Sequence, residues 1–153
     1  MIIKIRPARK NDEKEILRLI TELAKFEKLM PPDSNAKKRL IKDAFSRNPP
    51  FKILLAECDG VITGYAFYFF TYSTFLAKKT LYLEDIYINE NFRKNSIGTL
   101  FMKRLFMIAS EKNCGRMEWI VLDWNKKAIR FYENLGAKEM KERKFFRYNF
   151  IKF

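Results

Sequence analysis

The sequence predicts a single α/β (α+β) domain in which a central sheet of mixed strand direction is covered by helices on both faces. Segments with helical and strand-like patterns follow one another in the order strand, two helices, three strands, helix, strand, helix, strand. The composition, 48% hydrophobic with only 5 Gly and 5 Pro in 153 residues, is that of a compact chain. A chain of this length needs only one core, so we expect one domain over residues 1–153.

Six segments are apolar and rich in β-branched or aromatic residues, as strands are. Asp59 and Gly60 separate two of them and give a strong hairpin signal. The expected strands are residues 2–6, 51–58, 61–72, 81–88, 117–122 and 145–151.

Four other segments carry apolar residues at helical spacing. Asp12, with Glu15 three residues later, is the expected cap of the first helix, and Ser34 that of the second. Paired prolines follow each of these two helices and end them. The expected helices are residues 12–28, 34–48, 97–112 and 126–134.

The net charge of +13, from 31 Lys and Arg against 18 Asp and Glu, favours anionic partners or a cofactor with anionic groups. The basic residues recur evenly along the chain, which is typical of a solvated surface, so no nucleic-acid partner is expected. With no His and only Cys58 and Cys114, a metal site is not expected, and nucleophile schemes that need His are excluded. No 18-residue apolar run and no N-terminal signal pattern occur, which predicts a cytoplasmic protein with no membrane partner.

The most informative segment runs from Thr80 to Leu100. A strand that carries Glu84 and Asp85 leads into a basic turn, residues 93–96, and the turn opens an amphipathic helix at Ile97. Backbone amides at such a helix start bind phosphate oxygens. A seat for phosphate beside a candidate proton acceptor suggests an enzyme that holds a phosphorylated cofactor and removes a proton from its substrate.

Several strings along the chain resemble those of the GCN5-related N-acetyltransferase (GNAT) superfamily, and within it the diamine (spermidine/spermine) acetyltransferases and their thialysine-acetylating relatives. The strings are Ile5-Arg6-Pro7-Ala8, residues 17–20, 22–27, 68–72 and 81–85, Trp124-Asn125, Phe131-Tyr132 and Gly136-Ala137. The resemblance implies a mostly antiparallel sheet of about six to seven strands. It also implies acetyl-CoA as co-substrate, a small-molecule amine as the other substrate, and a homodimer.

The turn departs from the pattern of the family, Arg/Gln-x-x-Gly-x-Gly/Ala, because Ser96 stands at the first glycine position. Glycine serves there since the backbone approaches the phosphates closely and favours a positive φ. We expect altered affinity for the cofactor and not lost binding; the alternative is an ordinary helix N-terminus. The residues that the resemblance assigns to cofactor binding are Ile86, Tyr87, Ile88, Arg93, Lys94, Asn95, Ser96, Ile97, Gly98, Thr99, Asn125 and Tyr132.

Acetylation needs an unprotonated amine, so a group must accept its proton. Glu84, directly or through a water, is the expected base. The resemblance makes Tyr132 the acid that protonates the CoA thiolate, and Asn125 a residue that binds the pantetheine or orders its helix. Alternatively, Glu84 pairs with lysines and Tyr132 is a packing residue. The expected substrate-binding residues are Phe26, Glu27, Phe75, Glu84 and Asp85.

The identity of the amine stays open at this point. Aromatic and acidic groups on the first helix favour a diamine or polyamine, whereas Arg143, Lys144 and the net charge favour a lysine-like amine that carries a carboxylate. A protein N-terminus or lysine side chain is a further possible acceptor. A basic RNA-binding module without catalysis is the alternative from another class.

Overall fold

The computed structural model describes residues 1–151. Residues Met1–Ile120 form one compact unit, and a second unit begins at Val121. The first unit contains a five-stranded sheet in the order β1-β2-β3-β4-β5. Its strands are β1 (Ile3–Pro7), β2 (Lys52–Cys58), β3 (Val61–Ser73), β4 (Lys78–Ile88) and β5 (Arg116–Trp119). Neighbours from β1 to β4 are antiparallel, whereas β5 runs parallel to β4.

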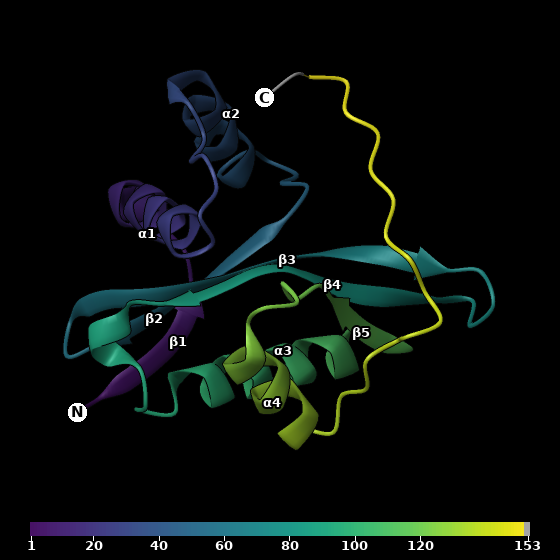
Figure 1. Cartoon of the computed structure of the whole chain (residues 1–153). Coiled ribbons are helices and arrows are strands. Elements are labelled where there is room, and N and C mark those ends of the chain that lie inside the picture. Colours follow the sequence, from purple (N-terminus) through teal and green to yellow (C-terminus); the bar gives the residue numbers. More distant parts are fainter. Residues whose placement is uncertain (152–153) are drawn as a thin grey trace. The chain divides into compact units, whose positions relative to one another are not determined.

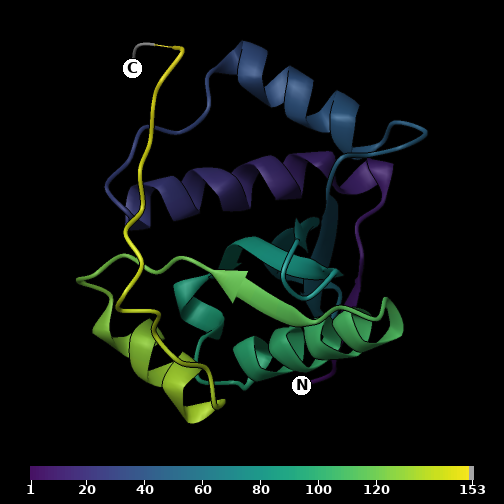
Figure 2. The ribbon, with the colours of Figure 1, turned by 90° about the vertical axis from the view of Figure 1, so that its right-hand side faces the viewer.

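Helices cover both faces of this sheet, as predicted. Helices α1 (Glu13–Phe26) and α2 (Ser34–Ala44) lie over one face, and α3 (Ile97–Glu111) lies over the other (Figure 1, Figure 2). Two short 3-10 helices, η1 (Lys10–Asp12) and η2 (Glu90–Phe92), precede α1 and follow β4. The second unit contains helix α4 (Lys126–Asn134).

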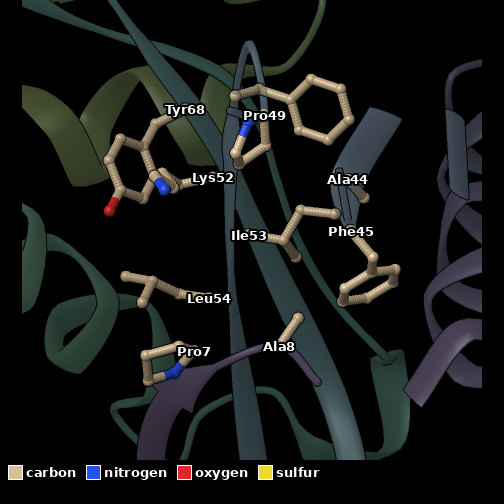
Figure 3. Close-up of a pocket in the computed structure, with 10 residues that line it drawn as sticks. Pro7, Ala8, Ala44, Phe45, Pro49, Lys52, Ile53, Leu54 and Tyr68 are labelled. Carbon is tan, nitrogen blue, oxygen red and sulfur yellow. The ribbon is translucent and has the colours of Figure 1, made fainter. Parts of the chain in front are cut away.

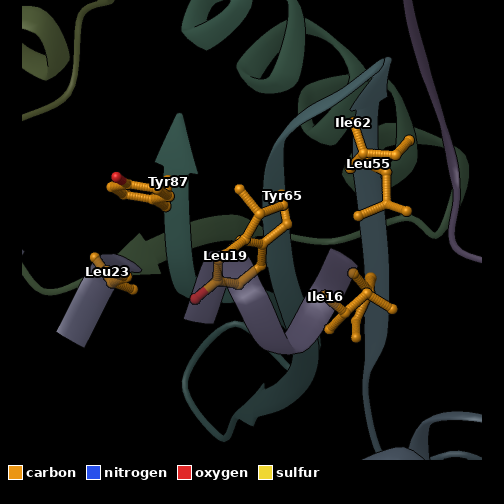
Figure 4. Packing of buried hydrophobic residues seen from close by; sticks show 8 residues of the cluster. Ile16, Leu19, Leu23, Leu55, Ile62, Tyr65 and Tyr87 are labelled. Carbon is orange, nitrogen blue, oxygen red and sulfur yellow. The ribbon is translucent and has the colours of Figure 1, made fainter. Parts of the chain in front are cut away.

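The core on the α1 face forms because α1 repeats apolar residues every three or four positions. Ile16, Leu19 and Leu23 of this helix pack against alternate residues of the strands (Figure 4). The complete cluster is Ile16, Leu19, Leu23, Ile53, Leu55, Ile62, Tyr65 and Tyr87. Across the sheet, α3 buries Ile97, Phe101, Met102 and Leu105. Strand β4 is thus held from both sides.

The helix caps differ in part from the prediction. Asp12 occupies the cap position of α1, but its carboxylate accepts hydrogen bonds from Arg6 Nη1 at 2.8 Å and the Arg9 amide at 2.7 Å. Asp33, one residue before the predicted Ser34, caps α2 by accepting from the Ala36 amide. The pairing of Asp12 with Arg6, and the use of Asp33 in place of Ser34 as a cap, both depend on the folded surroundings. Local sequence propensity does not include these surroundings.

The prediction of six to seven strands is wrong, because the described part of the chain forms five. Residues 145–151, predicted as the last strand, pair with no strand among residues 1–151. Their side chains stay exposed, to 87% at Phe146 and 94% at Phe150. An aromatic, strand-like composition gives a segment the propensity to pair, but the pairing itself depends on a second strand meeting it in register, which composition does not determine. Strand β5 is also shorter than the predicted 117–122.

Candidate active site

Strand β4 leaves the sheet open on its β5 side. It pairs with β5 only over Thr80–Leu83, whereas its pairing with β3 continues to Ile88. On the β3 side, Phe67 faces Asp85 and Tyr68 faces Leu83, so Glu84 is the extra residue of a β-bulge. The bulge coincides with the point where β5 departs. From Glu84 onward, β4 therefore presents a backbone edge that β5 does not pair with, suited to the amides of a pantetheine arm.

The turn after β4 presents backbone amides at the start of α3. Lys94 and Ser96 both adopt left-handed φ values, of 65° and 61°. Ser96 is the N-cap of the 15-residue helix but makes no side-chain cap hydrogen bond, so the N–H groups of its first turn receive no cap. Uncapped amides at the N-terminus of a long helix, beside Lys94, suit the oxygens of a diphosphate. The expected preference for a positive φ at Ser96 is confirmed.

Other residues of this turn support its shape. The Asn95 side chain donates to the carbonyl of Phe92 at 3.0 Å. The Arg93 guanidinium lies over the ring of Phe26, with its Cζ 4.8 Å from the ring centroid, and its Nε donates to the carbonyl of Ile88 at 3.0 Å. These two predicted cofactor-binding side chains thus contact protein groups.

Three carboxylates interact at the end of α1 and the bulge of β4. Glu27 follows the last residue of α1, Glu84 is exposed at the bulge, and Asp85 is half-buried beside Tyr65. The Tyr65 hydroxyl donates to Asp85 Oδ2 at 3.2 Å. Burial, with the charges of Glu84 and Glu27, raises the pKa of Asp85 to about 6, although the Tyr65 hydrogen bond lowers it. Burial also raises the pKa of Glu27. The cluster is therefore suited to a cationic ligand.

The two predicted aromatic substrate residues lie in different places. Phe26 is the last residue of α1, directly before Glu27 in the chain, and its ring lies against the Arg93 guanidinium. Phe75 is 98% exposed in the turn between β3 and β4. Strand β4 advances about 3.3 Å per residue, so Asp85 lies roughly 23 Å beyond Lys78, the first residue of the strand. The structure thus places Phe26 next to Glu27 in the chain and separates Phe75 from the carboxylates.

The predicted acid lies in the second unit. Tyr132 of α4 is 9% exposed, and burial raises its pKa to about 12, so its phenol keeps its proton at neutral pH. Asn125 caps α4, since its side chain accepts from the Ala128 amide at 3.3 Å. This contact supports the interpretation that Asn125 orders the helix. Whether Glu84 and Tyr132 share one cleft stays a prediction, because they belong to different units.

A pocket of about 300 Å³ lies at the start of β2, and Figure 3 shows its lining. Most of the lining is apolar, with Lys52 and Tyr68, paired across β2 and β3, as its polar groups. None of the predicted site residues lines it.

Residues 1–151 contain no group of three His, Cys, Asp or Glu placed to hold a metal ion. None of the described helices is both long and apolar enough to cross a membrane.

The sequence prediction missed Tyr65. The hydroxyl of this residue reaches Asp85 only because β3 and β4 pair in the observed register, with Tyr65 opposite Tyr87. The hairpin signal at Asp59-Gly60 sets the register of β2 with β3, but no comparable turn fixes β3 against β4. The alternation of side chains in both strands shows which residues share a face. Only the register of β3 against β4 shows that Tyr65 and Asp85 are neighbours on that face.

Comparisons with known proteins agree with this geometry. The model of the Acetyltransferase (GNAT) family matches residues 15–137. Thialysine N-epsilon-acetyltransferase of Mus musculus is 40% identical over 147 residues, which cover 91% of this chain and 86% of that protein. Spermidine/spermine N(1)-acetyltransferase-like protein 1 of Homo sapiens is 38% identical over 144 residues, or 90% of this chain and 21% of that protein.

A solved structure described as a possible acetyltransferase from Clostridium difficile 630 has the same fold. Its TM-score is 0.85 at 20% identity, over 99% of this chain and 100% of that chain. The family match spans most of the chain, and the mouse relative covers nearly its whole length. The chain therefore belongs to the acetyltransferase (GNAT) family and is an acetyl-CoA-dependent N-acetyltransferase.

Proposed function

We propose that this enzyme acetylates a primary amine of a small molecule, either lysine-like, such as thialysine, or a diamine or polyamine. The observation that carries the proposal is the cluster of Glu27, Glu84 and Asp85 beside the open edge of β4. An ammonium group is attracted to such a cluster, and the first carboxylate that it meets can hold it while another accepts its proton. The names of the mouse and human relatives support both amine types.

In the proposed mechanism Asp85 orients the amine and Glu84 removes its proton. Asp85 is held by Tyr65 and is suited to a fixed contact, whereas Glu84 is exposed and open to water. Proton transfer from the ammonium to Glu84, through a water, leaves a lone pair on nitrogen. Acetyl-CoA supplies the activated acetyl group when it is bound. The nitrogen forms a bond to the acetyl carbon, the bond from that carbon to sulfur breaks, and Tyr132 gives its proton to the thiolate. The acylated nitrogen then loses its second proton, which returns through solvent to the Tyr132 phenolate and leaves a neutral amide.

The open edge of β4 and the turn at residues 93–99 are the proposed seat of acetyl-CoA. The edge from Ile86 to Ile88 suits the pantetheine amides, and the start of α3 with Lys94 suits the diphosphate. Asn125 orders the helix that carries Tyr132. We further propose that both units form one N-acetyltransferase domain and that the protein is a homodimer. The unpaired edges of β1 and β5 support the dimer, since such edges pair readily with another chain.

The proposal is tested by measuring CoA thiol release with acetyl-CoA and a panel of thialysine, lysine, ornithine, putrescine, spermidine and short peptides. Mass spectrometry of the products locates the acetyl group. We expect thiol release that depends on a small amine and falls strongly in Glu84→Gln, while Lys42→Gln, a change on exposed α2, keeps wild-type rates. Turnover of peptides with no turnover of any small amine would overturn the proposed substrate class.

A further inference from the structure

We infer that Arg93 is a positioning residue that ties the amine side of the site to the acetyl-CoA side, and is not chiefly a phosphate ligand. The inference deepens the proposed function and rests on it for its kinetic test. The Arg93 guanidinium contacts two rings: its Cζ is 4.8 Å from the centroid of Phe26 and 5.6 Å from that of Tyr87. Both distances lie within the range of cation–π attraction.

The three contacts of Arg93 reach three separate parts of the site. Phe26 ends α1 and directly precedes Glu27 of the carboxylate cluster. Tyr87 belongs to the open end of β4, and Ile88, whose carbonyl accepts from Arg93 Nε at 3.0 Å, is its last residue. Arg93 itself begins the basic turn. One side chain therefore joins the end of α1, the edge of β4 and the turn before α3.

The chemistry of arginine suits this arrangement. A guanidinium is planar, so it can stack on aromatic faces while Nε donates in the plane of the group. A lysine ammonium keeps the charge but has neither the plane nor the fixed fork of donors. Arginine and lysine both bind phosphate, but in this structure the Arg93 guanidinium contacts two rings and donates to the Ile88 carbonyl. Arg93 and Lys94 therefore divide two tasks, with Lys94 available to the diphosphate.

A second set of contacts joins α1 to the end of β4. Glu22 of α1 accepts from Asn89 Nδ2 at 3.0 Å and from Arg18 Nη1 at 2.5 Å. Burial chiefly raises the pKa of Tyr87, and the charge of Glu22 and its hydrogen bond with the Tyr87 hydroxyl add to this effect. The middle of α1 is thus anchored to the end of β4 without Arg93. Loss of Arg93 should release only the last turn of α1, which ends at Phe26, together with Glu27 directly after it, and leave the fold intact.

The kinetic test compares Arg93→Lys with Lys94→Gln, a matched change at the next residue. In Arg93→Lys we expect KM for the amine to rise roughly tenfold, because an ammonium cannot stack on both rings while it donates to the Ile88 carbonyl. KM for acetyl-CoA should change less than about twofold. In Lys94→Gln we expect the opposite pattern. If Arg93→Lys retains wild-type KM for the amine, or raises only KM for acetyl-CoA, the inference is overturned.

A structural test does not depend on turnover. Amide hydrogen exchange reports local opening at the end of α1, where the amides of Glu27 and Leu29 donate to Leu23 and Ala24. Arg93→Lys should speed exchange at these amides severalfold, and Phe26→Leu should do the same, with no further increase in the double variant. Lys94→Gln should leave them unchanged. Equal protection in wild type and Arg93→Lys would sink the inference, even if the proposed substrate were correct.

Discussion

Asp85 and Tyr65 show how a single hydrogen bond between neighbouring strands sets the chemistry of a carboxylate. Burial and the charges of Glu84 and Glu27 favour the protonated form of Asp85, whereas the hydroxyl of Tyr65 favours the ionised form. Tyr65 is itself completely buried, so its hydroxyl has a fixed direction. An ionised Asp85 is what a cationic amine requires. Near pH 6 the balance between these effects decides whether Asp85 is ionised and able to bind the amine.

Replacing Tyr65 by Phe removes the hydroxyl but keeps the packing of the ring. Since the hydrogen bond lowers the pKa of Asp85, its loss should raise that pKa above about 6. The acidic limb of the pH profile of kcat/KM should then move to higher pH, because Asp85 is protonated sooner as the pH falls. A steady-state profile from pH 5 to 9 with a saturating cofactor checks this. An unmoved limb would show that Asp85 does not control amine binding.

Ser96 carries backbone strain that glycine would relieve. A residue with a Cβ at φ 61° pays a penalty of roughly 1 kcal/mol relative to glycine. Ser96→Gly should therefore raise the free energy of unfolding by about 0.5–1 kcal/mol. Urea denaturation measures the change. Lys103→Gly, at an exposed position in the middle of α3, is the control and should lower the free energy of unfolding by about 1 kcal/mol. A lower free energy of unfolding in Ser96→Gly would contradict the idea that Ser96 is strained.

At the scale of elements, helix α4 depends on its cap. Its exposed first turn is basic, with Lys126 and Lys127, which is unfavourable at a helix N-terminus. The Asn125 side chain offsets this by accepting from Ala128. The cap thereby positions the turn that leads to Tyr132.

Two substitutions separate capping from cofactor binding at Asn125. Asn125→Ala should cost about 1 kcal/mol of stability, whereas Asn125→Asp keeps an acceptor at the cap and should preserve it. Thermal unfolding of both variants checks this. If capping is the main role, Asn125→Asp should also keep KM for acetyl-CoA near the wild-type value. A large rise of KM in the stable Asp variant would show that the amide group binds the pantetheine.

The elements differ in how well the sequence predicts them, and the reason is physical. The 3.6-residue period of α1 and the hairpin signal at Asp59-Gly60 are local, and both elements form as predicted. The β-bulge at Glu84 and the early end of β5 depend on which strands become neighbours. Residues 145–151 have strand propensity but no strand partner in the described chain. The local sequence pattern predicts a single helix or strand, whereas the pairing of a strand also depends on a second strand elsewhere in the chain.

At the scale of the whole molecule, the site prediction rested on the resemblance to a family more than on pattern. The strand–turn–helix pattern singled out Glu84, Asp85 and the basic turn, and the resemblance gave them their roles and extended the turn to residues 93–99. The structure places these residues around the open end of β4. It did not reveal Tyr65 or the contacts of Arg93 with Phe26 and Tyr87, because those depend on the register and packing of this chain. Phe75, assigned in the same way, lies apart.

The central claim is that the carboxylates of the first unit and Tyr132 of the second act on one bound pair of substrates. A crystal structure with a bisubstrate conjugate, in which the CoA sulfur is joined through an acetyl linker to thialysine or a diamine, tests it most directly. We predict an amine nitrogen within hydrogen-bond reach of Asp85, with Glu84 reaching it directly or through one water, and the sulfur within reach of the Tyr132 hydroxyl. A conjugate whose amine contacts none of Glu27, Glu84 and Asp85, or whose sulfur lies away from Tyr132, would contradict the account.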